Sequence, residues 1–329
     1  MDILMTQTAF DRFGERLSGL GLDVQAMRMQ SDGSLVVGEE QVEWDAARPD
    51  VAWATADLFD DGAPLRPYFG FLMQAESIRW LQSPAAGVDA PIFGDLVRKG
   101  MRLTNSHASA VSIAEFIIGS VLDVCQRRGE WRQAQAEQRW EPHDFAEVSG
   151  TTWLVVGLGH IGAATASRAA ALGAKVIGVR RRPSGTEAVD QMITPDGIAR
   201  ALPSADVIVL SAPATPETDH LVDADFLGRV KDGAVLVNVA RGSLVDQEAL
   251  LSALDDGPLG AAVLDVFATE PLPEGHPLWT HPRVTVSPHG SAGGTGRYRR
   301  AAEEFFANLE SFITDGILVN EITEADLPG

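Results

Sequence analysis

The segment that decides the fold is Thr152-Trp153-Leu154-Val155-Val156-Gly157-Leu158-Gly159-His160-Ile161-Gly162. Its first five residues are apolar or β-branched and predict a buried strand. Three glycines follow at the spacing Gly-x-Gly-x-x-Gly, and residues 161–172 predict a helix that opens at once. Strand, glycine turn and helix in this order are typical of the phosphate-binding unit of a Rossmann domain.

Each residue of this turn has its own expected task. Gly157 permits the tight turn, Gly159 lets a pyrophosphate approach the backbone, and Gly162 lets helix and strand pack closely. The helix N-terminus would add N–H groups and positive potential for the phosphates. Glycine-rich turns are common, but the flanking strand and helix favour a dinucleotide site. The backbone of His160 and Ile161 belongs to this predicted site, whereas the His160 imidazole occupies a variable position and has no predicted role.

The next expected strand, residues 174–179, runs into Arg180-Arg181-Arg182. An NAD-dependent enzyme usually has an acidic residue here, which accepts hydrogen bonds from ribose hydroxyls. Guanidinium groups instead pair with a 2′-phosphate and stack on adenine. A solvated basic loop is the alternative. Because the chain has a formal net charge of −20, three consecutive arginines favour a phosphate site. We therefore expect NADP(H) to be the preferred cofactor, with NAD(H) as the second candidate.

The rest of the chain alternates between strand and helix patterns, which predicts parallel sheets covered by helices. In the second half, further strands are expected at residues 206–210, 234–238, 261–265 and 283–287. Asp246 predicts an N-cap for a helix over residues 246–254. In the first half, strands are expected at residues 3–6, 23–29, 50–55 and 77–82, and a helix at 9–20.

The middle and the end of the chain complete the predicted organisation. A long helical pattern covers residues 108–128, and a last long helix is expected at 298–312. The stretch from Trp131 to Trp140 has no strong period and too few large aliphatic residues for a core, so we expect it to wrap over a neighbouring surface. These patterns divide the chain into a dinucleotide-binding domain, residues 104–292, and a substrate-binding domain formed by residues 1–103 and 293–329.

Composition narrows the class of protein. The 329 residues, 45% of them hydrophobic, suffice for two domains with separate cores. A net charge of −20 argues against nucleic-acid binding, because phosphates repel such a surface. No apolar run approaches the roughly 20 residues that span a bilayer, and the N-terminus lacks a secretory signal pattern. Cys125 is the single cysteine, which excludes an internal disulfide, so a cytoplasmic location is expected.

Three segments of the second half point to a family. They are Asn238–Asp246, Leu264–Pro273 and Val286–Gly290, and in this order and spacing they resemble the D-2-hydroxyacid dehydrogenases. The resemblance covers nearly the whole chain, including Pro213–Thr218 and Ala86–Asp89, and is stronger in the second unit. It implies an α/β fold of two Rossmann-like or flavodoxin-like domains with doubly wound parallel sheets, and an active-site cleft between the domains.

In that family an Arg, a Glu and a His are catalytic, and the resemblance assigns these roles to Arg241, Glu270 and His289. Reduction of a ketone needs a hydride on carbon and a proton on oxygen. His289 is the candidate acid, because imidazole exchanges a proton near neutral pH. Glu270 would hold the ring and stabilise its protonated form. Arg241 would offer a planar fork to a substrate carboxylate and polarise the carbonyl.

Each member of this trio has a structural alternative. Arg241 could pair with a backbone carbonyl at a strand end, Glu270 could be an exposed loop acid, and His289 a buried histidine with satisfied hydrogen bonds. Any one residue alone would be structural more often than catalytic. All three in one family-like order favour catalysis.

The resemblance also implies contacts to cofactor and substrate. Besides the glycine turn and the arginines, the expected cofactor contacts are Ala212, Pro213, Thr218, Val239, Ala240, Asp265 and His289. Asp265 would hold the nicotinamide carboxamide. The backbone N–H groups of Ala85, Ala86 and Gly87 would bind the substrate carboxylate, although without the family match a routine turn is equally credible. Trp53 could wall the substrate pocket, and is at least as well explained as a core residue.

The details fit the glyoxylate and hydroxypyruvate reductase branch best, so the expected reaction is reduction of small 2-keto acids to D-2-hydroxy acids. The glycine-rich residues 290–294 depart from the family pattern and leave the substrate size open. The same fold could act on phosphoglycerate, formate or phosphite, but a phosphorylated substrate would need more basic residues near Ala85–Asp89. A nucleotide-sensing protein of the corepressor type is the alternative from another class, and turnover of NADPH would separate the two.

Two further expectations concern assembly and metals. The Trp131–Trp140 stretch resembles a dimer-forming arm, so a homodimer is expected. No metal site is expected, because His107, His143, His276 and His281 lack ligand spacing. Hydrolase chemistry is not expected either, since the chain has no Gly-x-Ser-x-Gly elbow.

Overall fold

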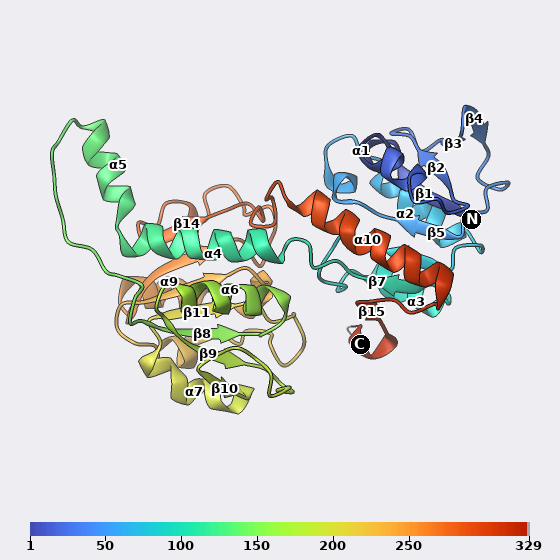
Figure 1. Cartoon of the computed structure of the whole chain (residues 1–329). Helices are drawn as coiled ribbons and strands as arrows, with labels where there is room; N and C mark the ends of the chain where they lie inside the picture. The colour runs from blue at the N-terminus through green and yellow to red at the C-terminus, as the bar shows by residue number, and fades with distance from the viewer. Residues whose placement is uncertain (328–329) are drawn as a thin grey trace. The chain divides into compact units, whose positions relative to one another are not determined.

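The structure is a computed structural model that describes residues 1–327. It contains two compact units, and each is described by itself. One unit holds residues 1–108 together with the C-terminal segment from Thr295, and the other holds residues 109–294 (Figure 1). No helix within residues 1–327 is both long and apolar enough to cross a membrane.

The unit of residues 109–294 is built on a seven-stranded sheet whose order is β10-β9-β8-β11-β12-β13-β14. The strands are β8 (Thr152–Val156), β9 (Lys175–Val179), β10 (Gln191–Ile193), β11 (Val207–Leu210), β12 (Ala234–Asn238), β13 (Leu259–Leu264) and β14 (Val284–Val286). All neighbours pair in parallel. The order reverses between β8 and β11, which is the switch point of a doubly wound sheet. The expected Rossmann fold is confirmed.

Helices cover both faces of this sheet, and the strand sequences reflect it. The covering helices are α4 (Ala110–Cys125), α6 (His160–Ala171), α7 (Ile198–Ala201), α8 (Ala224–Leu227) and α9 (Gln247–Asp255), and α5 (Arg128–Ala136) lies away from the sheet. Leu154 and Val156 of β8 belong to a core with α8 and α9. Trp153 and Val155 belong to a second core with α4 and α6. Because alternate side chains enter two cores, β8 is apolar from Trp153 to Val156.

The predicted elements of this unit are found with two corrections. Asp246 is the N-cap of α9, as predicted, since its side chain accepts hydrogen bonds from the N–H groups of Glu248 and Ala249. The sequence pattern missed β10, a short edge strand of partly buried residues. The long helix expected to residue 128 ends at Cys125, because Arg127 adopts a left-handed conformation with φ of +51°.

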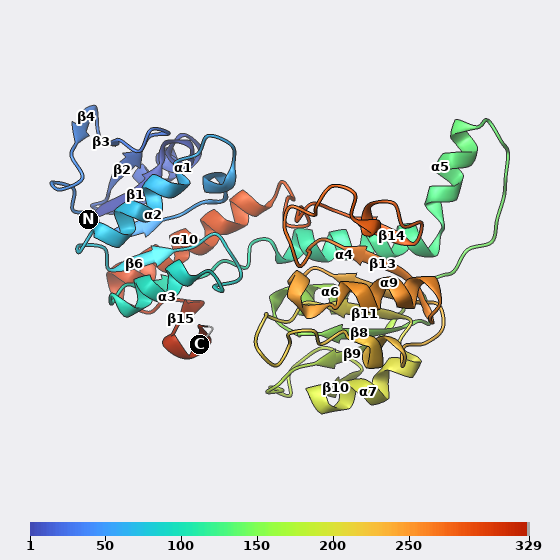
Figure 2. The same cartoon turned by 180° about the vertical axis from the view of Figure 1, so that it is seen from behind.

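A projecting arm follows that break. Residues 128–136 form the separate helix α5 within the stretch expected to lack a regular structure. In Figures 1 and 2, α5 and the chain after it project away from the sheet of their own unit. Trp140 is 99% exposed, so its side chain does not pack on the unit that carries it, and the neighbouring surface expected for this stretch stays a prediction.

The other unit has an eight-stranded sheet of order β15-β7-β6-β5-β1-β2-β3-β4. Its elements are β1 (Asp2–Thr6), α1 (Gln7–Ser18), β2 (Gln25–Met29), β3 (Leu35–Val37), β4 (Glu40–Val42), β5 (Val51–Trp53), α2 (Leu65–Gln74), β6 (Trp80–Gln82), α3 (Pro91–Arg98), β7 (Arg102–Thr104), α10 (Arg297–Thr314) and β15 (Glu321–Ile322). The central strands are parallel, which confirms the expected sheet there.

The edges of this sheet differ from the expected all-parallel arrangement. β3 pairs antiparallel with β2 and β4, and β15 pairs antiparallel with β7. A two-residue turn that starts at Gly38, with φ of +59°, joins β3 to β4. Such a turn can only connect antiparallel neighbours. The parallel centre of the sheet is therefore flanked by the β3–β4 hairpin at one edge and by β15 at the other. The sequence patterns did not predict these three strands.

Candidate active site

Nearly every residue predicted for the cofactor lies where a parallel strand of the second unit ends. β8 runs into the glycine turn, β9 into Arg180, and β12 into Arg241. β13 is followed by Asp265, and β14 by a short loop that carries His289. In doubly wound sheets the carboxyl ends of the strands, beside the switch point, form the ligand-binding edge. The topology thus brings residues from five separate segments to one edge.

The glycine turn has the close contacts that its sequence predicts. Gly157 adopts φ of +95°, and a Cβ there would lie 2.5 Å from the backbone nitrogen of Ala212. A Cβ at Gly162 would lie 2.0 Å from the carbonyl oxygen of Gly157. Only hydrogen fits at these two positions, because each would otherwise place carbon against backbone atoms.

Gly159 differs from its two neighbours, because a Cβ there would meet no atom within 4 Å. Gly159 is also the N-cap of α6 and, having no side chain, makes no side-chain capping hydrogen bond. The start of α6 therefore has open space in front of the first N–H groups of the helix. These N–H groups and the positive end of the helix dipole are what bind a pyrophosphate. The residues present fit a dinucleotide.

Two of the three arginines after β9 lie in a local network of charges. Arg180 Nη1 lies 3.2 Å from Glu187 Oε1. Burial, with a smaller contribution from the positive charge of Arg180, lowers the pKa of His160, so Arg180 acts on the glycine turn. A hydrogen bond from Thr215 lowers the pKa of Glu217, and the charge of Arg181 adds a smaller effect.

The remaining predicted cofactor residues follow β11 and β12. Thr218 Oγ1 donates to the carbonyl of Pro213 at 2.8 Å and accepts from the N–H of Thr215 at 2.8 Å, so it closes the loop that Ala212 begins. Val239 and Ala240 follow β12 and are buried.

Arg241 sits on a tightly braced turn. The buried Asn238 donates to the Arg241 carbonyl at 2.9 Å and accepts from the N–H of Ala240 at 3.0 Å. A Cβ at Gly242 would lie 1.9 Å from the backbone of Phe267, so only glycine lets this turn pack there. Arg241 Nη1 donates to the carbonyl of Ala240 at 2.7 Å, which is the backbone pairing named above as its structural alternative. The guanidinium has further donors beyond that bond.

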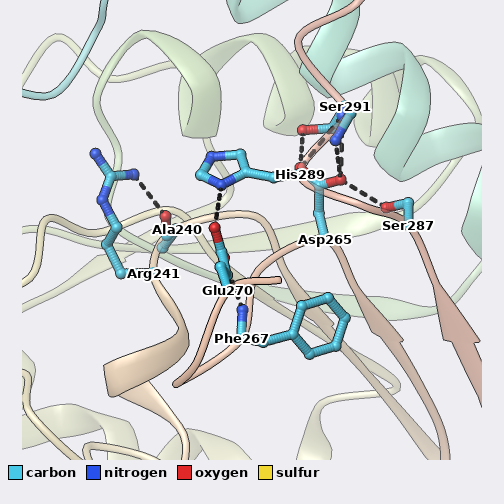
Figure 3. A network of polar contacts seen from close by, with 9 residues as sticks. Ala240, Arg241, Asp265, Phe267, Glu270, Ser287, His289 and Ser291 are labelled. Carbon is cyan, nitrogen blue, oxygen red and sulfur yellow. Dashed lines mark hydrogen bonds and ion pairs between the residues drawn. The ribbon is translucent and has the colours of Figure 1, made fainter. Parts of the chain in front are cut away.

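Glu270 and His289 form a direct pair (Figure 3). His289 Nδ1 lies 2.8 Å from Glu270 Oε2, and Glu270 Oε1 accepts the N–H of Phe267 at 2.9 Å. The imidazole is 52% exposed, so it is not the buried histidine of the structural alternative. Since Nδ1 is engaged by the carboxylate, Nε2 is the ring atom left for exchange with a ligand.

The backbone at His289 is held in an uncommon conformation with φ of +51°. Its N–H donates to the carbonyls of Asp265 at 2.9 Å and Ser287 at 3.0 Å. Asp265, only 1% exposed, accepts from Ser287 Oγ at 2.6 Å and from the N–H groups of Gly290 at 2.8 Å and Ser291 at 3.1 Å. These three contacts use Oδ1, and Ser291 Oγ and the Ser291 N–H also donate to Oδ2, so both carboxylate oxygens of Asp265 brace the loop that presents His289. The contact expected between Asp265 and a nicotinamide carboxamide stays a prediction.

The predicted substrate loop lies in the first unit, after β6. Ala85 and Ala86 point their carbonyls toward the segment after β7, where they accept from Ser106 N at 3.1 Å and Asn105 Nδ2 at 2.7 Å. Within residues 1–327 the N–H groups of Ala86 and Gly87 have no acceptor. Two adjacent donors without acceptors are suited to an anion.

Trp53 lies elsewhere in the first unit. It is 1% exposed and stacks on Phe305 with ring centroids 4.0 Å apart. Its burial favours the core interpretation over the pocket wall.

Several residues that hold the site residues in place were not predicted from the sequence. They are Asn238, Ser287, Ser291 and Glu187. Each is a common polar residue whose importance depends on its partner in space. The one available signal was Asn238, a polar residue that ends an otherwise apolar strand.

Comparison with known proteins identifies relatives of this arrangement. Residues 118–291 match the family model described as "D-isomer specific 2-hydroxyacid dehydrogenase, NAD binding domain". A glyoxylate/hydroxypyruvate reductase A from Serratia proteamaculans is 32% identical over 235 residues, which cover 69% of this chain and 75% of the relative.

Solved structures agree over nearly the full length. A D-isomer specific 2-hydroxyacid dehydrogenase family protein from Aeromonas salmonicida superposes with a TM-score of 0.80 at 30% identity, covering 98% of both chains. A D-isomer specific 2-hydroxyacid dehydrogenase from Xanthobacter autotrophicus, in complex with NADPH and MES, gives a TM-score of 0.76 at 27% identity, covering 98% of this chain and 97% of that one.

Proposed function

Because the chain belongs to the D-isomer specific 2-hydroxyacid dehydrogenase family, a family of oxidoreductases, we propose that it reduces small 2-keto acids such as glyoxylate or hydroxypyruvate to D-2-hydroxy acids, with NADPH preferred. The observation that carries this proposal is the Glu270–His289 pair at the strand edge that also carries the glycine turn. A proton donor and a dinucleotide cradle at one edge are what carbonyl reduction requires.

The proposed mechanism assigns one task to each residue of the trio. NADPH, when bound, supplies the hydride. His289 donates a proton from Nε2 to the carbonyl oxygen of the substrate, while Glu270 holds the ring through Nδ1 and balances its positive charge. Arg241 binds the substrate carboxylate and stabilises negative charge that develops on the carbonyl oxygen. Asp265 acts as a positioning residue, since it fixes the loop that presents His289.

The proposed cofactor site uses the start of α6 for the pyrophosphate and the arginines after β9 for the 2′-phosphate. The uncapped N-terminus at Gly159 and the open space above it support the first assignment. The cationic segment Arg180–Arg182 in an otherwise acidic chain supports the second. The NADPH complex of the Xanthobacter relative is consistent with this choice.

The proposal extends to the other unit and to assembly. We assign substrate binding to the unit of residues 1–108, where the N–H groups of Ala86 and Gly87 would receive the carboxylate. We further propose a homodimer formed through the projecting arm, because Trp140 and Phe145 expose 99% and 48% of their surface on it. A cytoplasmic location completes the proposal, supported by the single, partly buried Cys125.

A panel of 2-keto acids assayed with NADPH and NADH tests the activity. We expect turnover of glyoxylate or hydroxypyruvate and a higher kcat/KM with NADPH. If only a phosphorylated substrate, formate or phosphite is turned over, the proposed substrate class is wrong and the family assignment still holds. Nucleotide binding without turnover of any substrate would favour a nucleotide-sensing role instead.

A further inference from the structure

The loop between β9 and β10 contains a complete anion site that is filled by the chain's own carboxylate. Glu187 Oε1 accepts the N–H of Ser184 at 2.7 Å and lies 3.2 Å from Arg180 Nη1. Glu187 Oε2 accepts the N–H of Gly185 at 2.9 Å. Although the loop is at the surface, the Glu187 side chain is only 7% exposed. Two backbone donors and a guanidinium thus converge on one carboxylate.

The local sequence explains this geometry. Gly185 adopts φ of +78°, which lets the N–H groups of consecutive residues point to one side and form an anion-binding nest. Hydrogen bonds from this nest, chiefly from Ser184, lower the pKa of Glu187 to about 2. The side chain is therefore anionic under any working condition of the protein.

The same site lies where the adenosine end of the proposed cofactor is expected. Arg180 directly follows β9, and its charge acts on His160 at the start of α6. Guanidinium and backbone N–H groups are the donors that bind phosphate oxygens. Glu187 already occupies these donors, and its charge has the same sign as a 2′-phosphate.

We propose that Glu187 sets how strongly the protein discriminates between 2′-phosphorylated and 2′-hydroxyl adenine nucleotides, by competing with the 2′-phosphate for Arg180. This inference rests on the proposed cofactor site. Removal of the carboxylate strengthens binding of the 2′-phosphate, because a like charge is lost and Arg180 is released. It also removes an acceptor for ribose hydroxyls, which weakens binding of the 2′-hydroxyl form. Both effects raise discrimination in favour of the phosphate.

A purely structural role predicts the opposite result. If Glu187 only ordered the loop so that the arginines could meet the phosphate, its removal would weaken binding of the phosphorylated nucleotide most. The ratio of the two affinities therefore separates the roles, whatever happens to either affinity alone.

The test measures binding of 2′,5′-ADP and 5′-AMP by isothermal titration calorimetry to the full chain and to Glu187→Gln. We expect the ratio of the two Kd values to shift toward 2′,5′-ADP by about 3- to 10-fold, the effect of one like charge in a highly polar environment. The kcat/KM ratio of NADPH to NADH is expected to shift in the same direction. In an Arg180→Gln background the shift should vanish, because Glu187 acts through that guanidinium.

Asp225→Asn is the matched control, since Asp225 is an exposed acid of α8 that pairs with Arg229, and its loss should leave the ratio unchanged. An unchanged or lowered ratio in Glu187→Gln, or a shift that persists without Arg180, would overturn the inference. Glu187→Ala provides a second charge-free variant, and loss of folding in both would overturn it too, because Glu187 would then be structural. Failure of the wild type to bind either nucleotide would instead contradict the proposed cofactor site itself.

Discussion

His289 Nδ1 lies 2.8 Å from Glu270 Oε2, and this contact joins the loop after β14 to the loop after β13. Glu270 is fixed in turn by the N–H of Phe267, which its other oxygen accepts at 2.9 Å. The ring is thus oriented from one side only, with Nε2 left for a ligand. A half-exposed imidazole held in this way can give up a proton and regain it from solvent.

The Arg241 guanidinium is expected to act mainly in substrate binding. Arg241→Ala should raise the KM for hydroxypyruvate by about 10- to 100-fold, because a charged hydrogen-bonding pair contributes roughly 1.5–3 kcal/mol. Steady-state kinetics at saturating NADPH measures this. Arg229→Ala, which removes an exposed arginine just after α8, is the control. An unchanged KM would return Arg241 to the structural role in which it binds the carbonyl of Ala240.

The carboxylate of Glu270 is expected to orient the His289 ring for proton transfer through its contact with Nδ1. In Glu270→Ala that contact is lost, so kcat should fall by about 10- to 100-fold while the KM changes less. Steady-state kinetics with hydroxypyruvate at saturating NADPH measures this. Glu274→Ala removes an exposed acid from the same loop and should leave kcat in place. A Glu270→Ala kcat that coincides with the wild type would remove Glu270 from proton delivery.

The glycine turn allows two substitutions of equal size with opposite consequences. Gly162→Ala should lower the free energy of unfolding by about 2–3 kcal/mol or more, because its Cβ would lie 2.0 Å from the Gly157 carbonyl oxygen. Gly159→Ala should leave stability nearly unchanged, since a Cβ there meets nothing within 4 Å, and should weaken NADPH binding instead. Chemical unfolding and cofactor titration of both variants check this. Equal losses of stability in Gly162→Ala and Gly159→Ala would refute the assignment of a packing role to Gly162 and a cofactor role to Gly159.

The projecting arm predicts the oligomeric state. A monomer would leave Trp140 at 99% exposure in water, so we expect light scattering to report a dimer at micromolar concentration. Trp140→Ser should raise the dissociation constant of that dimer. Leu172→Ser, at an exposed apolar residue that follows α6, is the control. A monomeric wild type would contradict the proposed assembly.

Much of this arrangement could be predicted from the sequence, for identifiable reasons. β8 and the glycine turn are determined locally, since a buried strand must be apolar and Gly157 and Gly162 each face backbone atoms. The trio was found through its family-like order along the chain. Local periodicity, by contrast, predicted neither the break at Arg127 nor the edge strands, because short edge strands carry little apolar pattern.

The supporting contacts could not be predicted, because they depend on partners distant in the chain. Nothing in the sequence around Asp265 indicates that its carboxylate braces residues 287–291. Glu187 looks like any surface acid until its carboxylate is seen between backbone donors and Arg180. The role of Trp53 could not be predicted either, because a tryptophan at a strand end can face a pocket or the core. Its stacking on Phe305 is visible only in the structure.

Removal of the His289 imidazole tests the central claim most directly. The measurement is oxidation of NADPH by hydroxypyruvate with wild type, His289→Ala and, as a control, His276→Ala, whose imidazole instead caps the short turn of residues 277–279. We predict that His289→Ala lowers kcat by about 10²- to 10⁴-fold with a much smaller change in the NADPH dissociation constant, and that His276→Ala stays close to wild type. A near-normal kcat for His289→Ala would contradict the account.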